Sequence, residues 1–520
     1  MNFNLILDPW ISVACGNCTK LLSLNETFAR AAEITDLAMP PHERISILRL
    51  LLCISQAALD EHLDYDDAIP GLREKLSASA IPYLDQWQPA FELFGDGQRF
   101  LQGLSKKHGT MRASKLDLHL STGNNSTLLD HRNLNSREIG FDRLATTLIS
   151  FQNFAPAMGG YEGLGPAVAR DMRHCFLHGR SLLETLNLNL LSYENLSNWT
   201  GEGMGRPIWE NMTELLDYRS EALRNARSTY LGRLCPFTRE IWIQSPTCIL
   251  IASNDSGLPK PPEIIEPSAS SLLVKKSNGS ETTELRSINP SRSVWRELDA
   301  ILAQGEGAKR PLYFENARTF GLQAVAVWSG GLSTDKGAVK TASSSLFAGE
   351  ISIPSKFFDG PPEYLVRYRG AIKAASVWAD AIGKATAEFA WRLQSSEADK
   401  AKKRKKPKDP FKAPAQADFW NRLEQHLPIL YNFALDPTKS ISDKPDTLGF
   451  AYNSENPYNP SAWHQLAGRL ARECYRRTCD PDRSRNLIAY VQGESQLWPK
   501  NPQKKEIEAY KKELKNTTAA

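Results

Sequence analysis

The sequence predicts a mixed α+β protein in which a large N-terminal domain precedes a C-terminal antiparallel four-helix bundle. Its 520 residues are more than one hydrophobic core normally supports, so several domains are expected. Strand-like and helix-like patterns alternate up to about residue 360, whereas only helical patterns follow Pro361 and Pro362. We therefore predict domains at 1–360 and 361–500, followed by a frayed, charged tail at 501–520.

The N-terminal domain is predicted to open with short strands and turns and to continue with a buried helix. This helix spans residues 42–62 and is entered through Pro40 and Pro41. Its most apolar window, residues 45–59, contains Arg49 and falls short of the ~20 apolar residues that span a bilayer. The opening MNFNLILDPW lacks the basic region of a signal peptide. We therefore expect a cytoplasmic protein with no membrane partner.

The rest of the N-terminal domain alternates between helical and strand-like segments. Apolar residues at helical spacing predict helices at 141–155, 180–192 and 292–302. Alternating residues predict strands in 228–245. The pattern of residues 319–353 is typical of a strand, a tight loop and a second strand. This alternation is the reason for expecting an α+β domain.

Four helical segments in series, separated by loops, predict the C-terminal bundle. Between the first two lies KAKKRKKPKDPFK, residues 400–412, whose basic side chains accompany the single acid Asp409. Such a block repels itself and cannot fold alone, so one interpretation is a solvated loop. The other interpretation is a flexible arm that binds phosphates with salt-sensitive affinity. The arm would use residues such as Lys402, Lys403, Arg404 and Lys405.

Composition alone does not indicate a nucleic-acid binder. The formal net charge is only +4, so any DNA contact must come from local patches. The eight cysteines are dispersed, which fits a reducing compartment better than a disulfide framework. Cys15 and Cys18 are spaced like a metal clip, but no second such pair follows, so we predict no metal site there.

Two segments invite a chemical interpretation. The glycine-rich AMGGYEGLG, residues 157–165, is neither GxGxxG nor a Walker loop, so nucleotide binding is not expected. It is either a turn between helices or backbone that approaches a DNA groove closely. In MRHCFLHGR, His174, Cys175 and His178 lie close together, and the two histidines would share one helix face. Because no carboxylate partner is nearby, we favour a helix-end or core role over a metal site.

Two other segments have the chemistry of a contact surface. The stretch from 124 to 144 begins with side chains that both donate and accept hydrogen bonds, suited to a metal, a carbonyl group or a nucleic acid. In VWSGGLSTD, residues 327–335, Ser329, Gly330 and Gly331 predict a sharp turn. This turn is either a plain hairpin tip or a thin loop that inserts between base pairs, with Trp328 or Leu332 as the apolar wedge.

The order of these segments resembles the large subunit of the type I-E CRISPR Cascade complex, the CasA family. The resemblance rests on NLILDPWISV, FLQG, TLLDHRN, GFDRLATTLISFQNFAPAMGG, GRSLLETLNLNLL, TYLGRLCPFTREIWI and RSVWRELDAIL, followed by the bundle. It covers roughly residues 3–495. It implies a crRNA-guided complex in which this subunit reads a protospacer-adjacent motif from the minor groove and helps to open the duplex for R-loop formation. The implied partners are the other Cascade subunits, crRNA, double-stranded target DNA and a helicase-nuclease.

The resemblance also implies which residues contact DNA. The first loop corresponds to 124–133, the glycine loop follows Pro156, a lysine lies at 275 or 276, and the wedge is at 329–332. The implied DNA-binding residues are Asn125, Leu129, Asp130, His131, Arg132, Ala157, Gly159, Gly160, Lys275, Lys276, Ser329, Gly330, Gly331, Leu332, Lys402, Lys403, Arg404 and Lys405. Asn124, Asn125 and Arg132 are implied to contact crRNA or the complex.

Some positions depart from the family pattern. Leu129 stands where an aromatic residue can lie, His131 where an asparagine can lie, and Ala157 replaces the first glycine. The wedge lacks the glutamine that some family members have at its tip. Only its backbone and the Leu332 side chain are then left to insert between base pairs. We expect a non-enzymatic subunit without metal or cofactor. The alternatives are a metal-dependent hydrolase built on His174 and its neighbours, and a protein-only scaffold.

Overall fold

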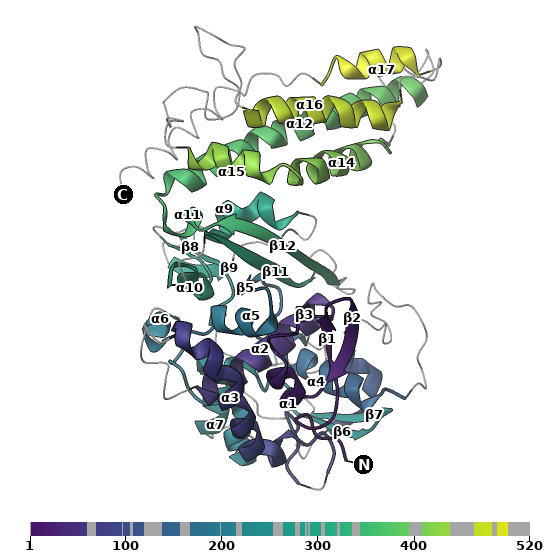
Figure 1. The fold of residues 1–520 in the computed structure, drawn as a ribbon. Coiled ribbons are helices and arrows are strands. Elements are labelled where there is room, and N and C mark those ends of the chain that lie inside the picture. Colours follow the sequence, from purple (N-terminus) through teal and green to yellow (C-terminus); the bar gives the residue numbers. More distant parts are fainter. Residues whose placement is uncertain are drawn as a thin grey trace. The chain divides into compact units, whose positions relative to one another are not determined.

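The computed structural model divides the chain into two units, Met1–Phe358 and Asp359–Ala520 (Figure 1). The predicted boundary near residue 360 lies beside this division. The fold is mixed α and β, as predicted. The structure describes residues 2–59, 69–95, 97–103, 108–118, 138–155, 167–197, 199–214, 221–252, 264–275, 281–285, 289, 292–302, 307–319, 323–334, 344–394, 408–436, 462–480 and 486–497.

The first unit begins with a small antiparallel sheet. Its strands are β1 (Ile11–Cys15), β2 (Cys18–Leu22) and β3 (Asp36–Leu37), in the order β2-β1-β3. Gly16 has a φ of +59° in the turn between β1 and β2, a conformation that glycine adopts without strain. Cys15 and Cys18 face each other across this turn as ladder partners.

The centre of the first unit is the helix α2 (Pro41–Ala58), which is buried over most of its length. It begins at Pro41 because proline at the first helical position gives up no hydrogen bond. It contacts α3 (Ile69–Trp87) and α4 (Phe141–Phe154). Other short helices of this unit are α1 (Leu24–Ala29), η3 (Gln88–Phe91), η4 (Ala113–Leu116), α5 (Leu182–Leu188), α6 (Tyr193–Ser197), η5 (Ile208–Glu214), α7 (Glu221–Ser228), α8 (Tyr230–Leu234), η6 (Val294–Glu297), α9 (Leu298–Leu302), η7 (Leu312–Glu315), α10 (Asn316–Thr319) and α11 (Lys356–Asp359).

Three more sheets of three strands belong to the first unit. One has the order β4-β7-β6, from β4 (His108–Arg112), β7 (Cys248–Ala252) and β6 (Ile241–Ser245). A second has the order β10-β8-β9, from β10 (Ala308–Lys309), β8 (Ser271–Lys275) and β9 (Glu281–Leu285). The third has the order β12-β11-β5, from β12 (Ser344–Pro354), β11 (Ala324–Thr334) and β5 (His174–His178).

The element type of residues 228–245 was predicted wrongly in part. Residues 228–245 were expected to be strands, but Tyr230–Leu234 form the helix α8, and only Ile241–Ser245 form a strand. Thr229 caps this helix through its side-chain oxygen, which accepts a hydrogen bond from the Gly232 N–H. Gly232 has no room for a side chain, because a Cβ would lie 2.1 Å from the Asn225 carbonyl oxygen. Capping and this close approach to α7 therefore outweigh the strand-like pattern.

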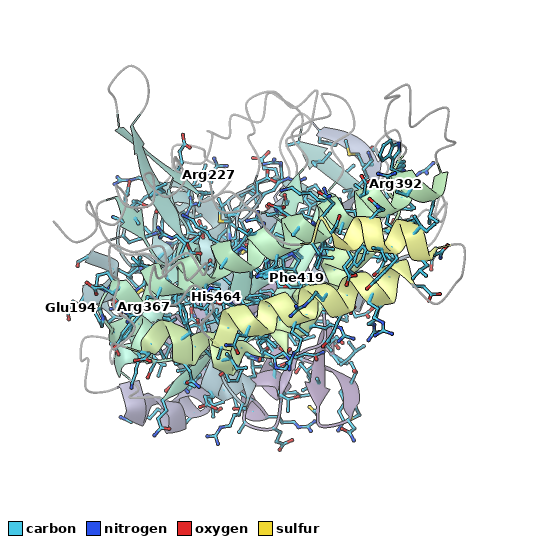
Figure 2. The ribbon with its side chains drawn as sticks, turned by 90° about the horizontal axis from the view of Figure 1, so that it is seen from above. Glu194, Arg227, Arg367, Arg392, Phe419 and His464 are labelled. Atoms are coloured by element: carbon cyan, nitrogen blue, oxygen red, sulfur yellow. The ribbon has the colours of Figure 1, made fainter. Side chains whose placement is uncertain are left out.

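The second unit is helical in its described part. Its helices are α12 (Glu363–Gln394), α14 (Lys412–Glu424), α15 (Leu427–Leu435), α16 (Ala462–Cys479) and α17 (Leu487–Glu494). The second of the four predicted helical segments is two helices, α14 and α15, because Pro428 lies in the first turn of α15 and cannot continue α14. Helix α12 contacts each of the other four. The described helices are thus five rather than the four predicted. Phe419 and His464 are buried among them (Figure 2).

Among the described residues, no helix is both long enough and apolar enough to cross a membrane.

Candidate nucleic-acid interface

The helix α4 separates two of the segments predicted to contact DNA. The polar segment ends just before α4, and the glycine-rich segment begins just after it. Residues 119–137 and 156–166 themselves lie outside the described residues. A helix rises 1.5 Å per residue, so the two ends of the 14-residue helix α4 lie about 20 Å apart. The described residues that anchor each segment therefore define the geometry of the interface.

A partly buried ionic cluster anchors the polar segment. Arg143 donates hydrogen bonds from Nε and Nη2 to Asp117 Oδ2, at 3.0 and 2.8 Å, and from Nη1 to Glu43 Oε2 at 2.7 Å. Burial opposes the charge of Arg143, but its bonds to Glu43 and the charge of Asp117 raise its pKa. Because Asp117 precedes the segment and Arg143 follows it, the cluster ties its two ends together and to α2.

The glycine-rich segment is closed by backbone hydrogen bonds. The Ala167 N–H donates to the Ala155 carbonyl at 3.1 Å, and the Ala169 N–H donates to the Asn153 carbonyl at 3.1 Å. Arg170 adds a bond from Nη1 to the carbonyl of Phe154 at 2.8 Å. Both ends of the segment are thus held against the C-terminal end of α4.

Residues 167–174, which we call the connecting segment, join this site to two sheets. The Asp171 N–H donates to the Leu332 carbonyl in β11 at 3.1 Å. His174 Nε2 donates to the Ala169 carbonyl at 2.8 Å, and its Nδ1 accepts from the Ser268 hydroxyl at 2.7 Å. Ser268 leads directly into β8, which ends at Lys275. The connecting segment therefore brings together the anchors of the glycine segment, the lysine-bearing strand and β11.

The structure does not support a metal site at His174, Cys175 and His178. They form the strand β5 rather than a helix. Burial lowers the pKa of His174 to about 4 and raises that of Cys175 to about 11, so both are neutral near pH 7. His178 Nδ1 lies 2.7 Å from Glu350 Oε2. Over the described part of the chain, no three His, Cys, Asp or Glu side chains are grouped as metal ligands.

The sharp turn predicted at Ser329, Gly330 and Gly331 is wrong. These residues and Leu332 lie inside β11, which pairs with β12 on one side and with β5 on the other. Ser329 is fully buried and Leu332 is 4% exposed. A Cβ on Gly331 would lie 2.5 Å from the Met172 carbonyl oxygen, so glycine is needed there for close packing. These four residues therefore cannot act as a wedge, and the two strands are joined by 335–343, outside the described residues.

The other predicted contact residues lie mostly outside the described part. Lys275 ends β8 and pairs with Glu281 of β9. The side chain of Lys275 lies outside the described part of the structure. The predicted residues outside the described ranges are Asn124, Asn125, Leu129, Asp130, His131, Arg132, Ala157, Gly159, Gly160, Lys276, Lys402, Lys403, Arg404 and Lys405.

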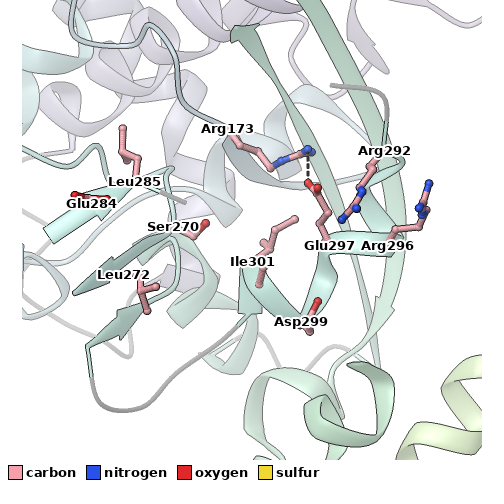
Figure 3. A pocket seen from close by; sticks show the side chains of 11 residues that line it. Arg173, Ser270, Leu272, Glu284, Leu285, Arg292, Arg296, Glu297, Asp299 and Ile301 are labelled. Carbon is pink, nitrogen blue, oxygen red and sulfur yellow. Dashed lines mark hydrogen bonds and ion pairs between the residues drawn. The ribbon is translucent and has the colours of Figure 1, made fainter. Parts of the chain in front are cut away.

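A polar cavity beside β8 and β9 was missed from the sequence (Figure 3). It has a volume of about 480 Å³ and is lined by Arg173, Arg292, Arg296 and Glu297 among others. Arg173 Nη2 lies 2.7 Å from Glu297 Oε2. Burial, with the charge of Arg292, lowers the pKa of Arg296 to about 10. Glu284 and Asp299 also line the cavity, so its positive and negative charges are balanced.

A row of exposed arginines on α16 was also missed. Arg469, Arg472 and Arg476 are exposed and lie three and four residues apart, which places them on one helix face. Arg469 Nε is 3.9 Å from Glu473 Oε1, a long contact that leaves 63% of its side chain exposed. The spacing of these arginines was the signal that could have revealed the row.

Comparison with protein families matches residues 4–474 to the family described as CRISPR-associated protein Cse1. The chain belongs to this family. The resemblance to the CasA family found in the sequence is thereby confirmed. The match ends within α16, so α17 and the residues after it lie beyond the family match.

A known Cse1 protein supports this membership in sequence. CasA/Cse1 of Thermus thermophilus is 33% identical over 225 residues, which is 40% of this chain. The aligned part spans 42% of that relative, less than half of its length.

Three solved structures share the fold. That of Thermus thermophilus CasA (Cse1) matches with a TM-score of 0.65 at 19% identity, over 95% of this chain and 98% of that chain. Thermobifida fusca Cse1 matches with a TM-score of 0.68 at 17% identity, over 95% and 98%. A chain in a structure described as a CRISPR RNA-guided surveillance complex matches with 0.65 at 18% identity, over 95% and 99%.

Proposed function

We propose that this Cse1-family chain is the large subunit of an RNA-guided surveillance complex and inspects double-stranded DNA. Family membership and the fold shared with a chain of a surveillance complex support the assembly. The observation that carries the DNA-inspecting role is the connecting segment. It fixes the ends of the glycine segment beside the strand that leads to Lys275. Fixed flanking residues of this kind favour groove recognition, which requires donors at defined positions.

The minor groove suits the residues that these anchors present. It offers mostly acceptor atoms, which lysine and arginine side chains and backbone N–H groups can contact. Gly159 and Gly160 let the backbone come close, Lys275 or Lys276 supplies a cation, and Arg132 supplies a second donor. Because the minor-groove pattern is degenerate, we expect several related motifs to be accepted.

Phosphate contacts would offset the cost of opening the duplex. Unstacking a base step costs a few kcal/mol. The lysine-rich segment 400–412 and the exposed arginines of α16 can each neutralise phosphates, which adds affinity without reading sequence. Asn124, Asn125 and Arg132 are proposed to contact crRNA or a neighbouring subunit. Recruitment of a helicase-nuclease completes the proposed role.

Target capture by the assembled complex tests this function. DNA with a randomised flanking motif beside a matched target is incubated with complexes that carry Lys276→Ala or Gly160→Asp. We expect each variant to lower capture of the preferred motif by about tenfold or more, as loss of a specific contact does. Lys20→Ala, an exposed lysine on β2, is the control and should leave capture unchanged.

Two results would overturn the proposal. Equal capture by complexes that lack this chain, whatever motif flanks the target, would favour a protein-only scaffold. Chelator-sensitive hydrolysis by the isolated chain would favour the metal-dependent hydrolase, against the buried and hydrogen-bonded state of His174.

A further inference from the structure

The polar cavity beside β8 and β9 has its charges at two separate ends. Figure 3 shows three arginines grouped near Glu297 at one end, and Glu284 beside Leu285 at the other end. The cavity has a volume of about 480 Å³, which lies within the range of small-molecule sites. A ligand that matches this arrangement carries negative charge at one end and hydrogen-bond donors at the other.

The arginine end has an excess of positive charge. Arg173 Nη2 lies 2.7 Å from Glu297 Oε2, so these two charges offset each other. Arg292 and Arg296 add two further cations, and Asp299 lies apart from them in Figure 3. Burial and the repulsion from Arg292 lower the pKa of Arg296 to about 10. A bound anion relieves this repulsion, and guanidinium groups match the oxygens of a phosphate with paired hydrogen bonds.

The glutamate end combines acceptor atoms with an apolar surface. Glu284 and Leu272 are ladder partners in β9 and β8, so their side chains leave the same face of the sheet. Both are exposed and both line the cavity. Within the described part of the chain, Glu284 forms no ion pair. Because an ionised carboxylate only accepts hydrogen bonds, this end suits a flat ring that packs on Leu272 and donates to Glu284.

We propose that this cavity binds a free guanine nucleotide, with its phosphate between Arg292 and Arg296 and its base at Glu284. Guanine carries two adjacent N–H donors on its Watson–Crick edge, which match the two oxygens of one carboxylate. Adenine and cytosine each carry an amine beside a ring nitrogen acceptor, and a carboxylate repels that acceptor.

This site is separate from the DNA-inspecting role, because its occupant is a free small molecule. It also makes no use of the glycine-rich segment 157–165, in which nucleotide binding is not expected. Arginine side chains, rather than the backbone of a glycine loop, hold the phosphate here.

Titration calorimetry of the full chain with guanosine monophosphate tests the proposal. We expect guanosine monophosphate to bind at least about tenfold more tightly than adenosine monophosphate, because a site built around specific hydrogen bonds rejects an analogue that lacks them. It should also bind at least about tenfold more tightly than inorganic phosphate, which leaves Glu284 without a donor.

Two variants at exposed positions separate the roles of the two ends. Arg292→Gln should weaken binding of guanosine monophosphate about tenfold, because it removes a charged donor from the phosphate. Glu284→Gln should shift the preference toward adenosine monophosphate, because an amide offers one donor and one acceptor to the adenine edge. Arg180→Gln and Glu33→Gln are the matched controls. Their side chains are 95% and 63% exposed outside the cavity, so binding should stay unchanged.

Each contrary result overturns the proposal. No binding of guanosine monophosphate means that the cavity is not a nucleotide site. Equal affinity for inorganic phosphate means that the arginines hold a simple anion, and equal affinity for adenosine monophosphate means that Glu284 does not select the base. Unchanged binding in Arg292→Gln, or weakened binding in the controls, means that the ligand lies elsewhere. Tighter binding of an oligonucleotide that begins with a 5′-phosphorylated guanosine means that the occupant is a strand end.

Discussion

The two units of this protein use charged side chains in opposite ways. In the first unit, Glu266 is fully buried between Arg49 and Arg233, with Oε2 2.6 Å from Arg49 Nη1 and Oε1 2.7 Å from Arg233 Nε. In the second unit, ion pairs such as Arg392 with Glu388 lie at the helix surface. A buried ion pair is stable only in a well-defined geometry, because its desolvation must be offset by close contacts. A surface ion pair is weakened by water and by dissolved salt.

This difference matches what each unit would do with DNA. The first unit holds the ends of the candidate recognition segments through buried polar contacts, and groove recognition requires fixed positions. The second unit is held by apolar packing around α12, where Ala371, Ala375 and Ala385 are fully buried, and its helix α16 displays a row of arginines outward. Phosphate binding requires charge but little geometric precision. The following predictions test this contrast, from the largest expected effect to the smallest.

Glu266→Gln should have the largest effect on stability. The variant leaves two buried guanidinium groups without the carboxylate between them, at a cost of about 3–5 kcal/mol. Urea unfolding followed by hydrogen exchange in peptides of each unit would measure this loss in the first unit. Glu388→Gln is the control in the second unit and should cost less than about 1 kcal/mol. Equal losses for the two variants would contradict the contrast.

Arg143→Met should have the second largest effect and should act locally. It removes the guanidinium that Asp117 and Glu43 share, while its length still fills the site, so we expect a loss of about 2–3 kcal/mol. Hydrogen exchange should rise first in η4 and at the start of α4, which flank the polar segment. Uniform destabilisation of the whole first unit would show that Arg143 is not a local clamp.

Mild acid should lower the free energy of unfolding of both units, because each contains a buried neutral histidine. Burial lowers the pKa of His174 and of His464 to about 4, from about 6.5 in the unfolded chain. Below pH 6.5 protonation therefore favours the unfolded state, and stability falls as the pH drops toward 4. The loss between pH 7 and 5 is about 2 kcal/mol for each histidine.

His464→Phe separates the two histidines, since it removes the titrating group from the second unit only. Unfolding of each unit, measured at pH 7 and pH 5, should show that the variant's second unit loses its share of the acid effect. The first unit should keep its own. If the second unit stays as acid-sensitive as before, groups other than His464 are responsible.

The spacing of apolar residues along the sequence was sufficient to predict the long helices. Helices α2 and α4 were predicted close to their observed bounds, because apolar residues repeat at helical spacing over several turns. Short segments were harder. β5 and α8 are five residues each, too short for periodicity to distinguish strand from helix, and contacts with distant residues decide between them.

The candidate site was predictable as a set of segments but not as an arrangement. Glycines and polar side chains indicated which segments to examine. The contacts that join them, such as His174 with Ser268 and Asp171 with Leu332, connect residues far apart in the sequence. The error at Gly330 and Gly331 has the same origin. Glycine marks both turns and close strand packing, and only the neighbouring strands β5 and β12 show which applies.

The exposed arginines of α16 should have the smallest effect on stability and a clear effect on salt dependence. Changing Arg469, Arg472 and Arg476 to Gln should alter the free energy of unfolding by less than about 0.5 kcal/mol per site. If all three contact phosphates, the slope of log K for duplex binding against log salt should become shallower by about 0.9 per residue. Arg224→Gln, a 73% exposed arginine of the first unit, is the control and should leave the slope unchanged. An unaltered slope in the α16 variants would show that the outward charge of the second unit does not bind DNA, and the proposed division of labour between the units would fail.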